Sequence, residues 1–219
     1  MYWIRFLVGI CLGSFVHCMA YRSAVSMHGK RSVCPTCGHV LAWYELIPLY
    51  SYLREGGRCR YCHTRIPLDV FLAELSTGIV CMCKFSTGIW LILLFLTIHD
   101  LYSMMIPDWC HVVLMLLWIG QAWNTERLLE GIFMVVLLCL LAWLMYRYKG
   151  EMCIGGGDIK LIGVCTLYLG MEGVWLQLLL SSSLALVYIL NKKKRTIPFG
   201  PFLSIIFYLL FITGGRCLV

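Results

Sequence analysis

The sequence predicts an all-α protein, a polytopic membrane helix bundle of about eight transmembrane helices with a small zinc-binding loop domain. Hydrophobic residues make up 61% of the 219 positions and charged residues 13%, with a mean hydropathy of +0.83. Soluble domains carry about a quarter charged residues, so this chain lacks the polar surface that a soluble fold needs. The apolar residues gather into long runs, and two cysteine pairs share one polar loop. The runs predict the bundle and the cysteines predict the loop domain.

Eight apolar runs are the candidate spans, separated by short charged or Gly- and Pro-containing breaks. They are Trp3–Ala20, Val70–Cys83, Ile89–Leu101, Trp109–Ala122, Leu128–Tyr146, Asp158–Leu169, Gly173–Leu190 and Pro198–Ile212. The second, third, fourth and sixth are shorter than the roughly 20 residues of an ordinary span, which indicates tilted, interfacial or shielded helices. The first run contains Gly, Ser and His and leads into a basic loop, so we do not interpret it as a cleaved signal peptide.

The basic residues predict the orientation of these spans, because Lys and Arg concentrate in cytoplasmic loops. With the N-terminus outside, fourteen of the eighteen Lys and Arg residues fall inside. The acidic loop from Asp100 to Asp108 is the inside loop that departs from the rule. The net charge of +7 is then a topology signal and not a nucleic-acid footprint. We expect the lipid bilayer as a partner, no nucleic acid, and a membrane-surface anchor at Lys192–Arg195.

Four of the thirteen cysteines form two Cys-x-x-Cys pairs in the long polar loop, Cys34 with Cys37 and Cys59 with Cys62. Two such pairs at this separation are typical of a tetrathiolate zinc site. A cytoplasmic loop lies in a reducing compartment, which disfavours structural disulfides, and no βαβ pattern accompanies the pairs as in a thioredoxin. Redox or disulfide chemistry is the alternative. Structural Zn²⁺ is the prediction, because a loop of this size needs a metal to fold.

Two carboxylates at the ends of apolar runs are the candidate catalytic residues. Asp100 ends one run, and Asp158 follows Gly155, Gly156 and Gly157 at the start of another. Intramembrane carboxylates are costly and indicate function. The dipole of its own helix favours an anion at Asp158 and disfavours one at Asp100, which suits a pair that shares a proton and activates water. Each aspartate taken alone also fits an ordinary helix terminus, as does Asp108.

Together these features resemble the type IV prepilin peptidases. The matching segments are Gly13–Phe15, Tyr21–Arg22, Cys34–His39, Trp43–Pro48, Gly57–Cys62, Glu74–Leu75, Thr77–Gly78, Asp100, Ile106–Asp108, Gly156–Leu161 and Ile197–Phe202. They occur in order, from about residue 9 to residue 203. After the second cysteine pair the chain departs from many relatives, with Ile66-Pro67-Leu68-Asp69 where they carry Ser and then Arg-Tyr-Pro.

The resemblance implies a GxGD-type membrane aspartyl protease of the bacterial cytoplasmic (inner) membrane with a periplasmic N-terminus. Its substrates would be prepilins or pseudopilins of type IV pilus and type II secretion systems, cut after a Gly on the cytoplasmic side. Asp100 and Asp158 occupy the catalytic positions, with Gly156, Gly157, Lys160, Asp108 and Glu74 as supporting residues. The tetracysteine loop further implies N-methylation of the new N-terminus with S-adenosylmethionine.

The expected domains are a first transmembrane helix (1–21), a cytoplasmic tetracysteine loop domain (22–67) and a membrane-embedded peptidase bundle (68–219). Glu74 would contact the substrate leader, orient the polar loop or serve only as a polar helix residue. Acids such as Glu45, Glu55, Glu74 and Asp108 would recognise the basic leader. The alternatives are a catalytically silent subunit of a pilus or secretion assembly, a proton-coupled transporter that uses both aspartates, and a membrane thiol oxidoreductase.

Overall fold

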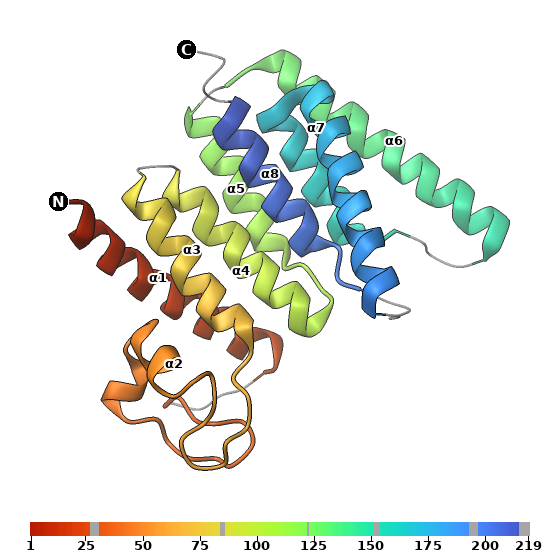
Figure 1. The fold of residues 1–219 in the computed structure, drawn as a ribbon. Helices are drawn as coiled ribbons and strands as arrows, with labels where there is room; N and C mark the ends of the chain where they lie inside the picture. Colours follow the sequence, from red (N-terminus) through yellow and green to blue (C-terminus); the bar gives the residue numbers. More distant parts are fainter. Residues whose placement is uncertain (27–30, 84–85, 122, 151–153, 193–196, 215–219) are drawn as a thin grey trace. The chain divides into compact units, whose positions relative to one another are not determined.

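The fold is known from a computed structural model, shown in Figure 1, which describes all residues except 27–30, 84–85, 122, 151–153, 193–196 and 215–219. The described residues are mainly helical, with two isolated β-bridges in the loop region. The elements in chain order are α1 (Tyr2–Ala24), η1 (Trp43–Leu46), α2 (Tyr50–Arg54), α3 (Leu68–Met82), α4 (Thr87–Ser103), α5 (Asp108–Gln121), α6 (Thr125–Lys149), α7 (Gly156–Lys192) and α8 (Gly200–Gly214). The expected all-α class is therefore confirmed.

Each of the eight predicted spans falls on a helix, with two of them on α7. Those two are separated at Gly170, whose φ of 72° and ψ of 177° interrupt the helix. The predicted break between Leu169 and Gly173 is thus present. The predicted surface anchor falls on Lys193, Lys194 and Arg195, which lie outside the described residues, and on Lys192 at the end of α7.

Within the described residues, three helices are long and apolar enough to cross a membrane, namely α1, α6 and α7 up to Asn191. Helices α4 and α8 are apolar but shorter. On α6 the side chains of Leu129, Phe133, Val136 and Leu140 are all more than half exposed. An apolar surface of this kind belongs against lipid tails, because it would cause aggregation in water. The protein is a membrane protein, and the count of eight crossings stays a prediction.

The chain forms two compact units, Met1–Ile98 and His99–Val219. The first contains α1, the cysteine loop, α3 and most of α4, and the second contains the end of α4 and the helices that follow it. The boundaries expected from the sequence, at residues 21 and 67, divide the chain by its position relative to the membrane. They stay a prediction.

In the first unit, small residues let α1 and α3 approach at backbone distance. A Cβ on Gly9 would lie 2.8 Å from the Cα of Gly78, and a Cβ on Gly13 would lie 2.7 Å from the carbonyl oxygen of Ala73. Within a membrane, helices associate through such close packing because lipid tails offer no hydrophobic gain. This packing places the polar side chains of α1 beside those of α3.

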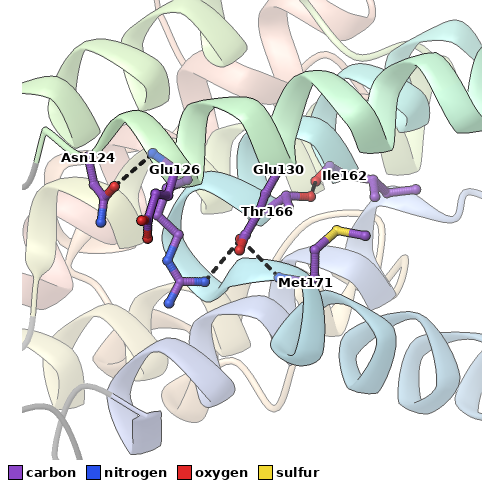
Figure 2. Close-up of polar contacts among 7 residues, drawn as sticks. Asn124, Glu126, Glu130, Ile162, Thr166 and Met171 are labelled. Carbon is purple, nitrogen blue, oxygen red and sulfur yellow. Dashed lines mark hydrogen bonds and ion pairs between the residues drawn. The ribbon is translucent and has the colours of Figure 1, made fainter.

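In the second unit, α6 packs along α7 through Gly131 and Gly163. A Cβ on Gly131 would meet Leu167, and a Cβ on Gly163 would meet Val135. Figure 2 shows the polar contacts at the N-terminal end of α6, where the Asn124 side chain accepts the N–H of Glu126 at 2.8 Å.

A carboxylate of α6 fixes the break in α7. Glu130 accepts hydrogen bonds from the Arg127 guanidinium and from the backbone N–H of Met171, each at 3.2 Å (Figure 2). The same guanidinium occupies the place that a Cβ on Gly170 would take. Glycine is therefore favoured at position 170 for two reasons: it adopts a positive φ without strain, and it leaves room for the Arg127 guanidinium.

Substitution Gly170→Ala should lower the thermal stability of the detergent-solubilised protein by about 2 kcal/mol or more, because it adds a steric clash to a disfavoured φ. The matched control is Gly120→Ala in α5, where a Cβ meets nothing within 4 Å. That control should be neutral or slightly stabilising. Equal melting temperatures for the two variants would contradict this description of the break.

Candidate active site and metal centre

The cysteine pairs sit on two similarly built turns. In the first, the Cys34 carbonyl accepts the N–H of Gly38, and Val33 bridges to Val40. In the second, the Cys59 carbonyl accepts the N–H of His63, and Arg58 bridges to Arg65. Gly38 has φ of 70° and His63 has φ of 55°, so both turns place a left-handed residue directly after the second cysteine. This backbone turns each pair of thiols to one side.

The four sulfur atoms of Cys34, Cys37, Cys59 and Cys62 come together in one cluster. All four Sγ atoms lie within 4.8 Å of one another. The Cys34–Cys62 and Cys37–Cys59 sulfur separations are 3.8 and 4.0 Å. Four thiolates around one tetrahedral zinc, each about 2.3 Å from the metal, are about 3.8 Å apart, whereas a disulfide requires about 2.05 Å. The cysteines are free, and their geometry fits a zinc-binding loop.

Two thiols of the cluster have a lowered pKa, whereas burial and the neighbouring thiols raise the pKa of Cys37 to about 11. Hydrogen bonding with Thr64 lowers the pKa of Cys62 to about 6. A backbone hydrogen bond from Cys37 lowers the pKa of Cys34. Metal binding requires thiolates, and a cation at the centre would also relieve the mutual repulsion of four of them. His39 and His63 lie outside the four-residue ligand cluster.

Glu74, on α3, is buried and holds the cysteine loop. Only 4% of its surface is exposed, and its carboxylate accepts the N–H of Leu49 at 2.7 Å. Leu49 has φ of 60°, a conformation that costs a non-glycine residue about 1–2 kcal/mol. Of the three roles considered for Glu74, this contact favours orientation of the polar loop.

A second polar contact joins α1 to the start of α3. The His17 ring lies 3.2 Å from the carboxylate of Asp69, and the His17 side chain is 9% exposed. Of the acids expected to recognise a basic leader, Glu45 is also taken up internally. Its carboxylate accepts the N–H of Ala42 at 2.7 Å, and its side chain is 7% exposed. Asp108 is the exposed member of that group, and Glu55 is half-buried.

Asp100, on α4, lies buried against the N-terminus of α8. It is 5% exposed, and its Oδ2 accepts the N–H of Gly200 at 3.0 Å. The sequence led us to expect that the carbonyl end of its own helix would disfavour an anion at this carboxylate. Instead, the first residue of α8 donates to it, and the positive end of that helix dipole favours the anion.

Asp158 lies half-buried in the first turn of α7, as expected. Asp100 acts on it electrostatically, and both carboxylates belong to the second unit. The glycines before it differ in their surroundings. A Cβ on Gly157 would lie 3.0 Å from the Ile106 side chain, whereas one on Gly156 would meet nothing within 4 Å. Gly157, and not Gly156, is therefore the glycine whose backbone packs closely against another segment.

The N-terminal half of α5 contacts the first turn of α7 on both sides of Asp158. The Lys160 ammonium lies 2.7 Å from the Asp108 carboxylate in an exposed ion pair. Such a pair contributes little to stability, because water screens it. The second contact is buried, because His111 is 6% exposed and its Nε2 lies 3.2 Å from the Gly157 carbonyl oxygen. The expected supporting residues Gly157, Lys160 and Asp108 thus gather around Asp158.

Two contributors to this site were not predicted from the sequence. Gly200 lies within the segment Ile197–Phe202 that carried part of the resemblance, and His111 lies one turn after Asp108. The available signal for Gly200 was its place near the start of the last apolar run. The first N–H groups of a helix have no partner within the helix, so they can donate to a buried carboxylate. Two carboxylates in partly desolvated surroundings, with helix N-termini beside them, can exchange protons with a water molecule at a reaction centre.

Comparison with known proteins gives two adjoining family matches. Residues 7–87 match the Bacterial Peptidase A24 N-terminal domain, and residues 87–190 match the Type IV leader peptidase family. No solved structure matches the chain.

Curated relatives named prepilin leader peptidase/N-methyltransferase match over most of the chain. The protein from Vibrio cholerae serotype O1 is 30% identical over 239 aligned positions, which cover 94% of each chain. The protein from Aeromonas salmonicida is 31% identical over 84% of this chain and 72% of its own length. The protein from Burkholderia pseudomallei is 31% identical, and the match spans 80% of this chain and 64% of that relative.

Substitution Glu74→Ala should free the cysteine loop and speed tryptic cleavage after Arg54, Arg58 and Arg60. A hydrogen bond to a buried carboxylate contributes about 1.5–3 kcal/mol, so cleavage that depends on local opening should accelerate about tenfold or more. Mass spectrometry of timed digests measures this. The matched control is Glu126→Ala, an exposed residue of α6. Unchanged digestion of the Glu74 variant would show that this residue does not hold the loop.

Proposed function

The chain belongs to the type IV leader peptidase family and is an enzyme, a prepilin peptidase, and from this premise we propose that Asp100 and Asp158 form its catalytic pair. The substrate class follows from the family: prepilins or pseudopilins that carry a short basic leader before an apolar helix. Cleavage would occur after the Gly that ends the leader, on the cytoplasmic side. The aspartates would activate the attacking water.

One observation carries this proposal: two aspartates that are 58 positions apart in the chain interact electrostatically within one helical unit. Two carboxylates that interact in low-dielectric surroundings can share a proton, because ionising both is unfavourable there. The ionised member takes a proton from water as the water attacks the peptide carbonyl. The protonated member donates a hydrogen bond to that carbonyl and later protonates the leaving amine.

The surroundings of the pair support these roles. The Gly200 N–H holds the Asp100 carboxylate in place, and Ile106 and His111 hold the backbone of Gly157 next to Asp158. A peptidase needs this rigidity, because displacement of a catalytic group by about 1 Å can cost roughly 100-fold in rate.

We further propose that the four loop cysteines bind one Zn²⁺ with a structural role. Four thiolates complete a tetrahedron and leave no position open for water, so the metal would stabilise the loop and take no part in hydrolysis. N-methylation of the new N-terminus with S-adenosylmethionine is inferred from the names of the relatives. Among the described residues we assign none to the methyl donor and derive no step through it.

The proposed location is the bacterial cytoplasmic membrane, with the N-terminus in the periplasm. The distribution of Lys and Arg supports this orientation, because the cysteine loop and the start of α7 then face the cytoplasm. A substrate with a basic cytoplasmic leader and an apolar helix would present its cut site at the same membrane face. A silent assembly subunit or a proton-coupled transporter would retain both aspartates without hydrolysing a prepilin.

Substitutions Asp100→Asn and Asp158→Asn should each reduce prepilin cleavage by about 10³-fold or more, because the amide keeps its size but cannot accept and return a proton. Purified enzyme in detergent is assayed on a full-length prepilin by mass spectrometry of the products. Asp69→Asn, in the first unit, is the matched control and should retain substantial turnover. Near-normal turnover in either active-site variant would remove that aspartate from the mechanism. Inactive wild-type enzyme would favour the silent subunit.

The purified protein should contain about one zinc per chain by plasma mass spectrometry, and Cys59→Ser should lose most of it. The matched control is Cys139→Ser, an exposed cysteine of α6 that should leave the metal content unchanged. Treatment with a chelator should reproduce the effect of the ligand substitution and lower the melting temperature. Full zinc occupancy in Cys59→Ser would contradict a tetrathiolate site.

A further inference from the structure

Helices α5, α6 and α7 of the second unit line a hollow of about 520 Å³. Apolar side chains make up most of its lining, with Val112 and Met115 from α5, Ile132 and Val136 from α6, and Val164 and Leu167 from α7. Val112, Ile132 and Val136 are each more than half exposed, so the hollow is an open groove on the side of the bundle. We call it the α5–α7 groove.

One end of the groove is polar and lies beside the proposed catalytic residue. Asp108, His111 and Lys160 line it there. Lys160 is two positions after Asp158, and His111 contacts the carbonyl of Gly157, directly before Asp158. From Lys160 the groove follows α7 to Leu167, about 10 Å along the helix axis. A chain that entered at the polar end would therefore pass from the catalytic site into apolar surroundings.

The polar end has hydrogen-bond acceptors to offer. His111 Nε2 must carry a proton to donate to the Gly157 carbonyl, so Nδ1 of the neutral ring is an acceptor. Nδ1 is buried and has no hydrogen-bond partner among the described residues. Asp108 has a carboxylate that is 75% exposed beyond its contact with Lys160. Of these two acceptors, the exposed Asp108 carboxylate is the one that a ligand in the groove reaches first.

We propose that the α5–α7 groove binds the apolar helix of the substrate that follows the cut, with the N-terminus of that helix directed at Asp108 and His111. This inference rests on the proposed peptidase function and names the docking surface of its substrate. The first turn of a helix has four N–H groups without internal acceptors and carries a partial positive charge. After cleavage a new ammonium group also stands there. The exposed Asp108 carboxylate complements both, because its contact with Lys160 uses Oδ1 and not Oδ2.

A phospholipid is the other ligand with an apolar body and a polar head, and the charges disfavour it. Among the described residues that line the groove, Lys160 is the one Lys or Arg, and it donates to Oδ1 of Asp108 at 2.7 Å, so a phosphate would have to compete with that carboxylate. A phosphate group would therefore meet the Asp108 carboxylate and the acceptor nitrogen of His111. A helix N-terminus meets the same two groups as a donor.

The test compares two substrates with two tryptophan variants of α6. One substrate is a full-length prepilin, and the other is a peptide that ends two residues after the cut and has no apolar helix. Ile132→Trp fills the groove, whereas Leu140→Trp adds the same bulk at an exposed position outside its lining. For the full-length substrate, Ile132→Trp should raise KM about tenfold with kcat nearly unchanged, which is the signature of lost binding alone. Leu140→Trp, and both variants with the short peptide, should stay within about twofold of wild type.

Equal KM values for the full-length substrate in the two variants would overturn the proposal, as would an equal loss with both substrates. A benzophenone side chain in place of Val112 adds direct identification of the occupant. Its cross-links to the apolar segment of the substrate support the proposal, and cross-links to lipid alone overturn it. Failure of the peptidase function itself looks different, because wild-type enzyme would then cleave neither substrate.

Discussion

The hydrogen bond from the Gly200 N–H to Asp100 is the interaction on which the site depends. A carboxylate that is 5% exposed within an apolar bundle needs a fixed donor in place of water. The start of α8 supplies that donor and directs the positive end of a helix dipole at the same group. Asp158 lies in the first turn of α7 and gains a similar dipole. The positive ends of two helix dipoles thus offset part of the free-energy cost of placing two acidic groups in a membrane.

The first unit uses the same device for a different purpose. Glu74 is a buried carboxylate of α3 that accepts a backbone N–H from Leu49, directly after Pro48. Asp100 is a buried carboxylate of α4 that accepts a backbone N–H from Gly200, two residues after Pro198. In each unit a helix acid anchors a proline-containing segment that is distant in the chain. In the first unit the anchored segment leads to the second cysteine pair, and in the second it begins α8.

Local patterns in the sequence were sufficient to predict the helices, the break in α7 and the cysteine cluster. Apolar runs and Gly170 are visible in single segments, and each Cys-x-x-Cys pair forms its own turn. The contacts of Asp100 with Gly200 and of His111 with Gly157 join residues 100 and 46 positions apart. Their existence depends on how whole helices pack, which no local pattern records. The adjacent glycines show the same limit. The sequence does not distinguish Gly156, where a Cβ would meet nothing, from Gly157, where a Cβ would meet Ile106.

The central claim is that Asp100 and Asp158 act as one unit, and the rates of the two single Asn variants and the double variant test it most directly. Each residual rate is measured by long incubation with excess prepilin. The effects of substituting residues that act together are strongly non-additive. The rate of the double variant should therefore lie within about threefold of the rate of the slower single variant. Independent roles would multiply the two losses, and a double variant slower by the product of both factors would contradict a shared catalytic pair.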